Sequence, residues 1–201
     1  MINWISPVTL QGKYVRLEPL SETHISGLAK IGIGQSFWNF MLYGNIQTEE
    51  DMRNWVLDIR SRAKKGTDLP FAVIHLASGQ VAGSTRYLNI MPKDRGLEVG
   101  GTWYGTEFQR TPVNTECKYL LLTHAFEVLK CIRVQIKTDK RNERSQKAIE
   151  RLGAKKEGIL RNHMILPDGR YRDSVFYSIL DSEWAGVKKN LEEMMAKYEK
   201  Q

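Results

Sequence analysis

The sequence predicts an α/β fold, in which a mixed, mostly antiparallel sheet carries helices on both faces. Alternating apolar residues indicate strands, and apolar residues spaced three or four positions apart indicate helices. These segments follow one another in the order β-α-α-β-β-β-α-β-α-β-β, so hairpins join most neighbouring strands. The exception is a helix between the strands at 97–104 and 132–138, which implies a right-handed crossover and a parallel pair.

The N-terminal third is predicted to contain one strand and two helices. Residues 14–20 alternate between apolar and polar side chains and form the strand. A helix follows over about 21–31, and two nearby glycines end it. Residues 37–46 are aromatic and irregular, which is typical of a loop that lines a pocket. Residues 48–51 match the capping-box pattern loosely, with Asp as the fourth residue, and the helix that they open stops near Gly66.

The middle of the chain is predicted to supply the centre of the sheet. Residues 70–76 and 81–90 are strands on either side of a turn, and they form a hairpin. The strand at 97–104 comes next, followed by a helix over 114–130 and a cleanly alternating strand at 132–138. The inward residues of this helix are predicted to be Leu121, Leu122, Ala125, Phe126 and Leu129.

The C-terminal part is predicted to contain a short helix, a hairpin and a last helix. The short helix covers 142–152, and strands at 155–166 and 171–180 flank the Pro-Asp-Gly turn at 167–169. Proline presets one dihedral angle of that turn, and glycine takes a positive one. Residues from 182 to about 200 form a polar amphipathic helix on the surface.

Residues 1–201 are predicted to form a single domain, because this length suits one core. No window approaches the ~20 apolar residues of a membrane helix, and the N-terminus lacks the basic and apolar regions of a signal peptide. We therefore expect a cytoplasmic protein with no membrane partner. Cys117 and Cys131 lie in apolar segments without metal-ligand spacing, so we interpret them as reduced packing residues and expect no metal site.

The net charge of +7 allows a polyanionic partner, which would be a nucleic acid or a phosphorylated cofactor. A solvated basic surface is the simpler interpretation. The densest basic groups lie at 60–65 and 137–151, and neither forms a stripe interleaved with aromatic residues. The sequence therefore does not favour a nucleic-acid partner.

A series of short motifs carries a resemblance to a known family. They are Glu98-Val-Gly, Thr115-Glu116, Asn142-x-x-Ser145 and Leu152-Gly153-Ala154. In this order and spacing, the chain resembles the Gcn5-related N-acetyltransferase (GNAT) superfamily. It is similar to the branch that contains the ribosomal-protein alanine N-acetyltransferases. Residues 161–178 also resemble the closing hairpin of that branch. The resemblance covers nearly the whole chain and implies transfer of an acetyl group from acetyl-coenzyme A to a primary amine.

The resemblance also implies how acetyl-coenzyme A binds. The central parallel strands splay apart, and the pantetheine arm lies in the gap along one strand backbone. Amides of the following loop and first helical turn hold the pyrophosphate, because unpaired N–H groups and the helix dipole favour an anion. The implied binding residues are Thr102, Trp103, Tyr104, Gln109, Arg110, Thr111, Val113, Asn114, Thr115, Asn142 and Ser145. Further basic residues either meet the adenosine phosphates or are solvated; they are Arg141, Arg144 and Lys147.

The pyrophosphate loop departs from the family pattern of Gln or Arg, two residues, Gly, one residue, then Gly or Ala. Pro112 stands at the first small position and Asn114 at the second. Proline has no N–H and cannot take a positive φ, so one phosphate contact is expected to be lost or rerouted. Arg110 can supply charge instead, and Asn114 can cap the helix with Glu116 in its first turn. A loop that no longer binds the cofactor is the alternative.

Two residues are the main catalytic candidates. Ser145 matches the serine proposed in the ribosomal-protein branch to protonate the departing thiolate, and the alternative is an exposed helix serine. Glu98 lies at the start of the splayed strand, where a carboxylate can take the amine's proton; the alternative is a charge at a strand end. Asp173 and His163 are weaker base candidates. The aromatic residues of 37–46, either lining the acceptor pocket or packing in the core, are Trp38, Phe40 and Tyr43.

The combined interpretation is an N-acetyltransferase that uses direct attack of the amine on the thioester. A backbone N–H near Trp103 can stabilise the oxyanion. The acceptor stays open between a protein N-terminus, which only the branch resemblance suggests, and a small amine. A non-catalytic module that binds an acyl-coenzyme A or a protein is the alternative, supported by Pro112. A homodimer is common in the family and is one option for the oligomeric state.

Overall fold

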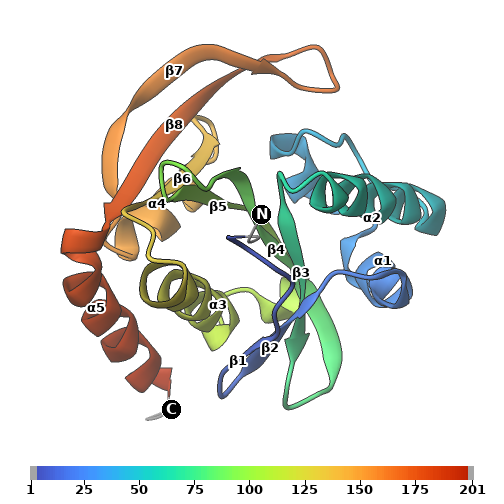
Figure 1. The fold of residues 1–201 in the computed structure, drawn as a ribbon. Helices are drawn as coiled ribbons and strands as arrows, with labels where there is room; N and C mark the ends of the chain where they lie inside the picture. The colour runs from blue at the N-terminus through green and yellow to red at the C-terminus, as the bar shows by residue number, and fades with distance from the viewer. Residues whose placement is uncertain (1–3, 199–201) are drawn as a thin grey trace.

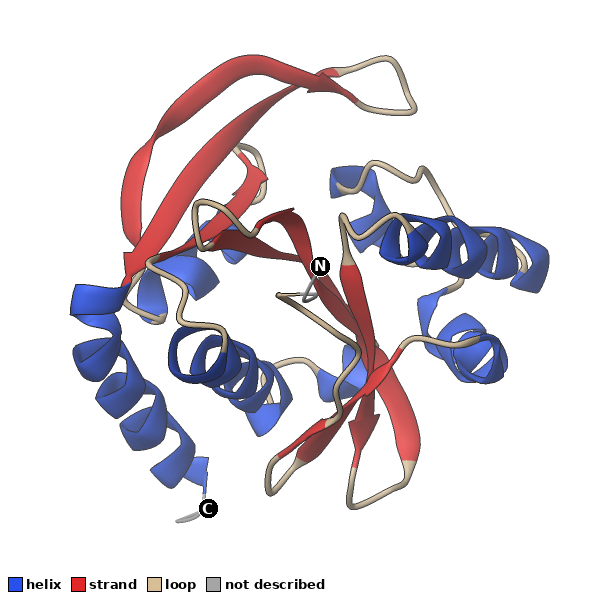
Figure 2. Ribbon diagram, viewed as in Figure 1, coloured by secondary structure: helices blue, strands red, loops and turns tan. Residues whose placement is uncertain are grey.

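The structure is a computed structural model that describes residues 4–198, and it shows an eight-stranded sheet with helices on both faces (Figures 1 and 2). The strand order is β1-β2-β3-β4-β5-β6-β8-β7, and the described pairings are antiparallel except for β5 with β6. This confirms the predicted fold class. The strands are β1 (Leu10–Gln11), β2 (Val15–Pro19), β3 (Leu69–His75), β4 (Gln80–Met91), β5 (Gly96–Tyr104), β6 (Arg133–Asp139), β7 (Lys155–Ile165) and β8 (Tyr171–Leu180).

The helices divide between the two faces of the sheet. Figure 1 shows α1 and α2 on one side, and α3 and α5 on the other, packed against each other. Their bounds are α1 (Ile25–Gly32), α2 (Glu49–Lys64), α3 (Pro112–Thr123), α4 (Glu143–Arg151) and α5 (Trp184–Ala196). Shorter 3-10 turns precede α1, α5 and the loop into α2, and a π turn at His124–Val128 ends α3.

The predicted capping box at the start of α2 is present. The Thr48 hydroxyl accepts the Asp51 N–H at 3.0 Å, and the Asp51 carboxylate accepts the Thr48 N–H at 2.9 Å. These bonds satisfy N–H groups that a helix start leaves without partners. The apolar face of α2 is buried against the sheet, as its spacing predicted.

The central parallel pair separates soon after it begins. Its register stops at Glu98 opposite Gln135, although β5 continues to Tyr104 and β6 to Asp139. On the other side of β5, the register with β4 shifts so that Gly101 and Thr102 together lie opposite Thr85, which is a β-bulge. Gly101 has φ +57, and a Cβ there would lie 2.7 Å from the Arg86 Nε. The bulge therefore requires glycine and turns β5 away from its parallel neighbour.

The β7–β8 hairpin forms an arch that extends beyond the helices and curves back toward the segment before α2 (Figure 1). Two arginines of the hairpin donate to backbone carbonyls of that segment: Arg170 to Asn39 at 3.3 Å and Arg172 to Phe40 at 3.2 Å. The turn glycine at 169 has φ +82, as the Pro-Asp-Gly pattern predicted. The two arginine bonds join the arch to the segment 36–46.

Several details differ from the sequence predictions. The strand β1 was not predicted, because two residues carry no periodic signal. The helix expected at 114–130 begins two residues earlier and ends in the π turn, and its five predicted inward residues are buried. The expected loop at 37–46 begins with a 3-10 turn at Ser36–Phe40. The last helix covers Trp184–Ala196, and the predicted residues beyond 198 lie outside the described residues.

Candidate functional site

The predicted pyrophosphate loop forms the start of α3, and Thr111 rather than Asn114 is its N-cap. The Thr111 hydroxyl accepts the Val113 N–H at 3.3 Å and donates to the Phe108 carbonyl at 2.7 Å. The prediction that Asn114 caps this helix with Glu116 in the first turn is therefore wrong. The sequence analysis placed the start of the helix at Asn114, whereas Pro112 is the first helical residue.

Pro112 suits this position for a physical reason. At the first helical residue no intrahelical partner exists for an N–H, so proline gives up nothing, and its fixed φ is already helical. Arg110 takes the positive φ, +63, that the glycine-containing family pattern allows and proline does not. Proline at 112 is thus compatible with a regular helix start after Arg110 and the Thr111 cap. Pro112 therefore no longer favours a non-catalytic module.

The loop before α3 contacts the start of α4 through two side chains. Gln109 donates to the Tyr104 carbonyl at 2.9 Å, and Arg144 donates to the Gln109 amide oxygen at 2.8 Å. Two segments that the sequence separates by 35 residues, both predicted to bind the cofactor, therefore meet at the open end of the splayed strands. Val113 and Thr115 are buried, so their side chains are not suited to contact a ligand.

Asn142 is the N-cap of α4. Its side-chain oxygen accepts the Ser145 N–H at 3.0 Å, and asparagine is among the residues most favoured at this position. The Ser145 side chain is half-buried, and its hydroxyl forms no hydrogen bond within residues 4–198. The serine hydroxyl is therefore free to bond a ligand at the helix start.

Behind the bulge of β5 lies a buried lysine that the sequence analysis did not single out. Lys118 of α3 donates to the Thr102 hydroxyl at 2.8 Å, and Thr102 in turn lies 2.8 Å from the Thr85 hydroxyl. Burial lowers the pKa of Lys118 to about 8, with a nearby cysteine thiol, Cys117, acting in the opposite direction. Helical spacing in the sequence could have indicated that Lys118 is buried, because it shares the apolar face of α3 with Leu121 and Leu122.

The Glu98 carboxylate is the centre of a buried polar cluster on the other face of the sheet. It is 2% exposed and accepts bonds from Asn89 at 2.8 Å, Gln135 at 2.9 Å and Lys137 at 2.7 and 2.9 Å. It lies at the last paired position of β5 and β6, where the splay begins. Its predicted location at the start of the gap is therefore correct, and Lys137 is the neighbour that the sequence analysis missed.

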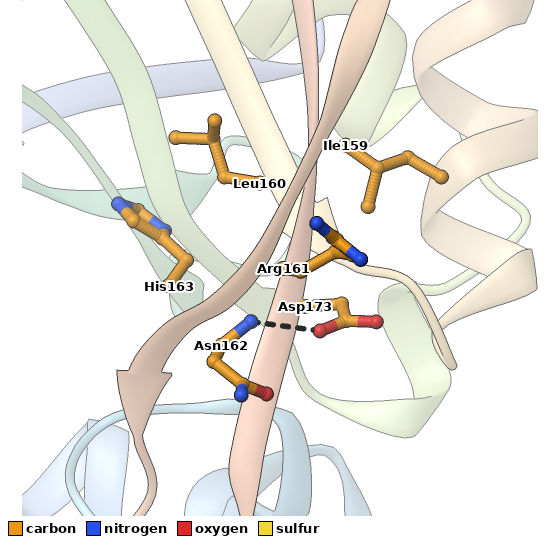
Figure 3. A pocket seen from close by; sticks show the side chains of 6 residues that line it. All are labelled: Ile159, Leu160, Arg161, Asn162, His163 and Asp173. Atoms are coloured by element: carbon orange, nitrogen blue, oxygen red, sulfur yellow. Dashed lines mark hydrogen bonds between the residues drawn. The ribbon is translucent and has the colours of Figure 1, made fainter.

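The bulged part of β7 places the two weaker base candidates on opposite sides of the hairpin. The register shifts between Leu160 and Met164, so residues 161–163 of β7 lie opposite the single residue Asp173 of β8. Figure 3 shows His163 on one side with Leu160, and Asp173 on the other with Arg161. An open hollow of about 880 Å³ surrounds this bulge. Asp173 accepts the Asn162 N–H at 2.9 Å, the bond drawn in Figure 3.

His163 lies on the side of the Glu98 cluster. Its Nδ1 is 3.0 Å from the Ser174 hydroxyl, and its ring packs edge-on against Phe176, which also contacts the Lys137 ammonium. Burial and, after it, the positive charges of Lys137 and Arg172 hold the pKa of His163 below its ordinary value. The imidazole is therefore neutral at pH 7.

The aromatic residues of the segment 36–46 differ in their surroundings. Trp38 is 1% exposed and packs against Trp103 and Trp55, so the core-packing interpretation holds for it. Tyr43 is half-buried, and its hydroxyl accepts a bond from Arg86 at 2.6 Å. Phe40 is half-buried, with its carbonyl bonded to the arch.

The described residues offer neither a metal-binding cluster nor a membrane-spanning helix. Within residues 4–198, no group of three or more histidine, cysteine, aspartate or glutamate side chains is arranged to hold a metal ion. In the same part of the chain, no helix has the length and apolar character needed to cross a membrane.

Comparison with known proteins identifies the family. The family model described as the acetyltransferase (GNAT) domain matches residues 15–155, which is more than half of the chain. A GCN5-related N-acetyltransferase from Brucella melitensis has 31% sequence identity and a TM-score of 0.87, with 95% of this chain and 86% of that one covered. The chain therefore belongs to the GNAT acetyltransferase family, as the motifs predicted.

Two further comparisons bear on the branch and the fold. A Bacillus subtilis (strain 168) protein named "Putative ribosomal N-acetyltransferase YdaF" is 34% identical over 113 residues, which are 56% of this chain and 61% of that protein. Its name agrees with the predicted likeness to the ribosomal-protein branch. Mycobacterium smegmatis RimJ, in complex with CoA-disulfide, shares the fold at 19% identity, with a TM-score of 0.79 and coverage of 94% and 95%.

Proposed function

We propose that the protein transfers an acetyl group from acetyl-coenzyme A to a primary amine. The observation that carries this proposal is the separation of β5 and β6 beyond Glu98, with the starts of α3 and α4 joined across its open end by Gln109 and Arg144. A cofactor that lies in such a gap is within reach of both helix starts. The amine then approaches from the side of the sheet that holds the Glu98 cluster and the arch.

The residues at the gap fit the parts of acetyl-coenzyme A. The backbone of Thr102, Trp103 and Tyr104 borders the gap and would bond the pantetheine amides. The first turn of α3 offers the N–H group of Asn114, because the Val113 N–H is bonded to the Thr111 hydroxyl, and the exposed Arg110 adds positive charge for the pyrophosphate. The set proposed to bind the cofactor is Thr102, Trp103, Tyr104, Gln109, Arg110, Thr111, Val113, Asn114, Thr115, Asn142 and Ser145.

Acetyl-coenzyme A supplies the activated acetyl group, as a thioester whose carbonyl the amine attacks. A backbone N–H of β5 near Trp103 would donate to the carbonyl oxygen as it gains negative charge. The Ser145 hydroxyl, free of partners within residues 4–198, would donate a proton to the departing sulfur. The chain thus supplies hydrogen-bond donors at the atoms that become negative.

Two groups can take the proton of the amine. Glu98 lies where the splay begins, but its carboxylate already accepts four hydrogen bonds and must give one up to accept another proton. His163 forms its bond through Nδ1, which leaves Nε2 free, and its lowered pKa keeps it neutral. We propose Glu98 as the base, with His163 as the competing acceptor.

Release of free thiol from acetyl-coenzyme A tests the function. A panel of peptides with free N-termini, amino acids, polyamines and amino sugars is incubated with the protein and acetyl-coenzyme A, and thiol release and product mass are measured. We expect at least one amine to be acetylated. Tight binding of acetyl-coenzyme A in calorimetry without transfer to any amine of the panel would favour a binding module instead. Ribosomal-protein N-termini come first in the panel, because the B. subtilis relative is named a putative ribosomal N-acetyltransferase.

Replacement of Ser145 tests the proton donor. Ser145→Ala keeps the backbone N–H that bonds Asn142, so α4 should begin unchanged, while turnover should fall about 10- to 100-fold with little change in the KM for acetyl-coenzyme A. Asn142→Ala is the matched comparison, because it removes the cap and should raise that KM more than it lowers turnover. Equal turnover for Ser145→Ala and the wild type would exclude Ser145 from the chemical step.

A further inference from the structure

One buried arginine on the arch has no carboxylate partner. Arg172 of β8 is 7% exposed, and its guanidinium forms a single hydrogen bond, from Nη1 to the Phe40 carbonyl at 3.2 Å, with Nε left without a partner. It forms no ion pair within residues 4–198. A buried charge without a counter-ion costs several kcal/mol, so such an arrangement is rare unless a ligand completes it.

The neighbouring charges do not compensate for Arg172. The Lys137 ammonium is paired with Glu98 at 2.7 Å, and Arg170, two residues before Arg172, is paired with the buried Asp139 at 3.0 Å. Each carboxylate nearby thus has its own cation. Burial lowers the pKa of Arg172, although Asp139 and Glu98 act in the opposite direction. The local sum of charges therefore leaves one positive charge on Arg172.

The position of Arg172 puts this charge on the acceptor side of the gap. It lies opposite Met164 on the arch and two residues before Ser174 on β8, so the side chains of Arg172 and Ser174 share the face on which His163 bonds the Ser174 hydroxyl. Its contact with Phe40 places it between the arch and the segment 36–46, on the side of the sheet proposed for the amine. A ligand that binds on this side of the gap, near the Glu98 cluster, would therefore lie close to the unpaired guanidinium.

We propose that the acceptor amine carries a carboxylate, and that Arg172 binds this carboxylate. This inference rests on the proposed acetyl transfer and names its substrate class. A guanidinium presents a planar pair of N–H donors that matches the two oxygens of a carboxylate. A single unpaired charge balances a carboxylate, whereas a phosphate would bring nearly two negative charges to a site with one free cation among the described residues.

Matched pairs of acceptors test the proposal through turnover. Amino acids are compared with their carboxamides, and peptide amides that contain Asp or Glu near the N-terminus are compared with the same peptides containing Asn or Gln. We expect the carboxylate member to have a KM at least about tenfold lower, which is the effect of one charged hydrogen bond. Equal kcat/KM for both members would overturn the proposal while leaving acetyl transfer established.

Variants assign that preference to one residue. Arg172→Gln should raise the KM for the carboxylate acceptors to that of their amides and leave the amides unchanged, and Arg172→Lys should retain part of the preference. Arg170→Lys is the matched control, because Arg170 ties the arch to the same segment but has its own carboxylate. It should keep the preference. Equal losses for acids and amides in Arg172→Gln would show that Arg172 only holds the arch, and would overturn the proposal.

A binding measurement separates this proposal from the proposed function. N-acetyl amino acids and N-acetyl peptides, as acids and as amides, are titrated into the wild type and Arg172→Gln in the presence of coenzyme A. Preferential binding of the acids that is lost in Arg172→Gln supports the anion site, even if no amine is acetylated, which would overturn only the proposed transfer. Equal binding of acids and amides by the wild type overturns the anion site.

Discussion

Two buried carboxylates in this protein accept similar numbers of hydrogen bonds from very different donors. Glu116 of α3 accepts three backbone N–H groups, from Lys13, Tyr14 and Val15, at 2.7–2.8 Å. Glu98 of β5 accepts its four bonds from side chains only, as described above. Backbone donors fix the course of the chain, whereas side-chain donors can change rotamer and release an oxygen when a ligand arrives.

The region around Glu116 is therefore a structural junction. Its carboxylate holds the turn between β1 and β2 against the helix whose first residues form the proposed pyrophosphate site. The turn fits closely, because a Cβ on Gly12 would lie 2.4 Å from the Glu116 carboxyl carbon. The region around Glu98 is where the sheet opens, and its side-chain donors come from β6 and from the end of β4. The same chemical group thus fixes a turn of the backbone in one region and lies where the sheet opens in the other.

Glu98→Gln should give the largest change in activity. The amide still accepts from Lys137 but cannot take a proton, so turnover should fall by at least about 100-fold. His163→Gln is the matched variant, and its turnover should fall by less than about tenfold. Steady-state rates with saturating acetyl-coenzyme A measure both, and the reverse order of losses would transfer the role of base to His163.

The pH dependence of kcat/KM sharpens the same comparison. The pKa of His163 is lowered, so a histidine base would lose activity only as pH falls below the ordinary histidine value of about 6.5, where the imidazole takes up a proton. If Glu98 is the base, the loss of activity at low pH does not depend on His163. We therefore expect the acidic limb of the wild-type profile to be retained in His163→Gln. Its disappearance in that variant would contradict the assignment of Glu98.

Glu116→Gln should instead give the largest change in stability. One oxygen becomes an NH₂ group that faces backbone N–H donors, so the free energy of unfolding should fall by roughly 3–5 kcal/mol. Denaturant unfolding measures this loss, and turnover at a temperature where the variant is folded should be within twofold of the wild type. Glu193→Gln, on the exposed face of α5, is the control and should change stability little. A stable Glu116→Gln with much lower turnover would reverse the two roles.

Lys118→Met should stabilise the protein by a smaller amount. The folded-state pKa of about 8 lies below the ordinary value of 10.5, so the charged amine costs roughly 2–4 kcal/mol at pH 7, and an apolar side chain of similar length avoids most of this cost. Loss of the bond to Thr102 offsets part of the gain. We expect a net gain of roughly 1–2 kcal/mol in the free energy of unfolding at pH 7.

The sign of the pH effect gives a second test of Lys118. Between pH 8 and 10.5 the unfolded chain holds the lysine proton more strongly than the folded protein, so this group makes the wild type more stable as pH rises. The difference in stability between Lys118→Met and the wild type should therefore shrink across that window. A constant difference would show that the pKa of Lys118 is not lowered in the folded protein.

The sequence by itself determined the order of the main elements, the parallel pair and the family. These follow from local signals: apolar periodicity, the capping pattern before α2, the Pro-Asp-Gly turn and the motif at 142–145. Such signals concern residues close in the chain, where spacing alone decides which side chains share a face. The position of Glu98 at the start of the gap followed from the family resemblance, which implied that the strand containing it splays from its neighbour.

Only the tertiary structure decided which charged groups are paired. Glu116 meets the turn at 13–15 across about 100 residues, and Arg144 meets Gln109 across 35. Arg170 finds a carboxylate while Arg172, two residues away on the same strand, does not. Charge pairing depends on distances of a few ångströms between remote segments, and no local pattern records them. The sequence supplied the charges, and the packing of the arch against the segment 36–46 decided which of them a ligand can still use.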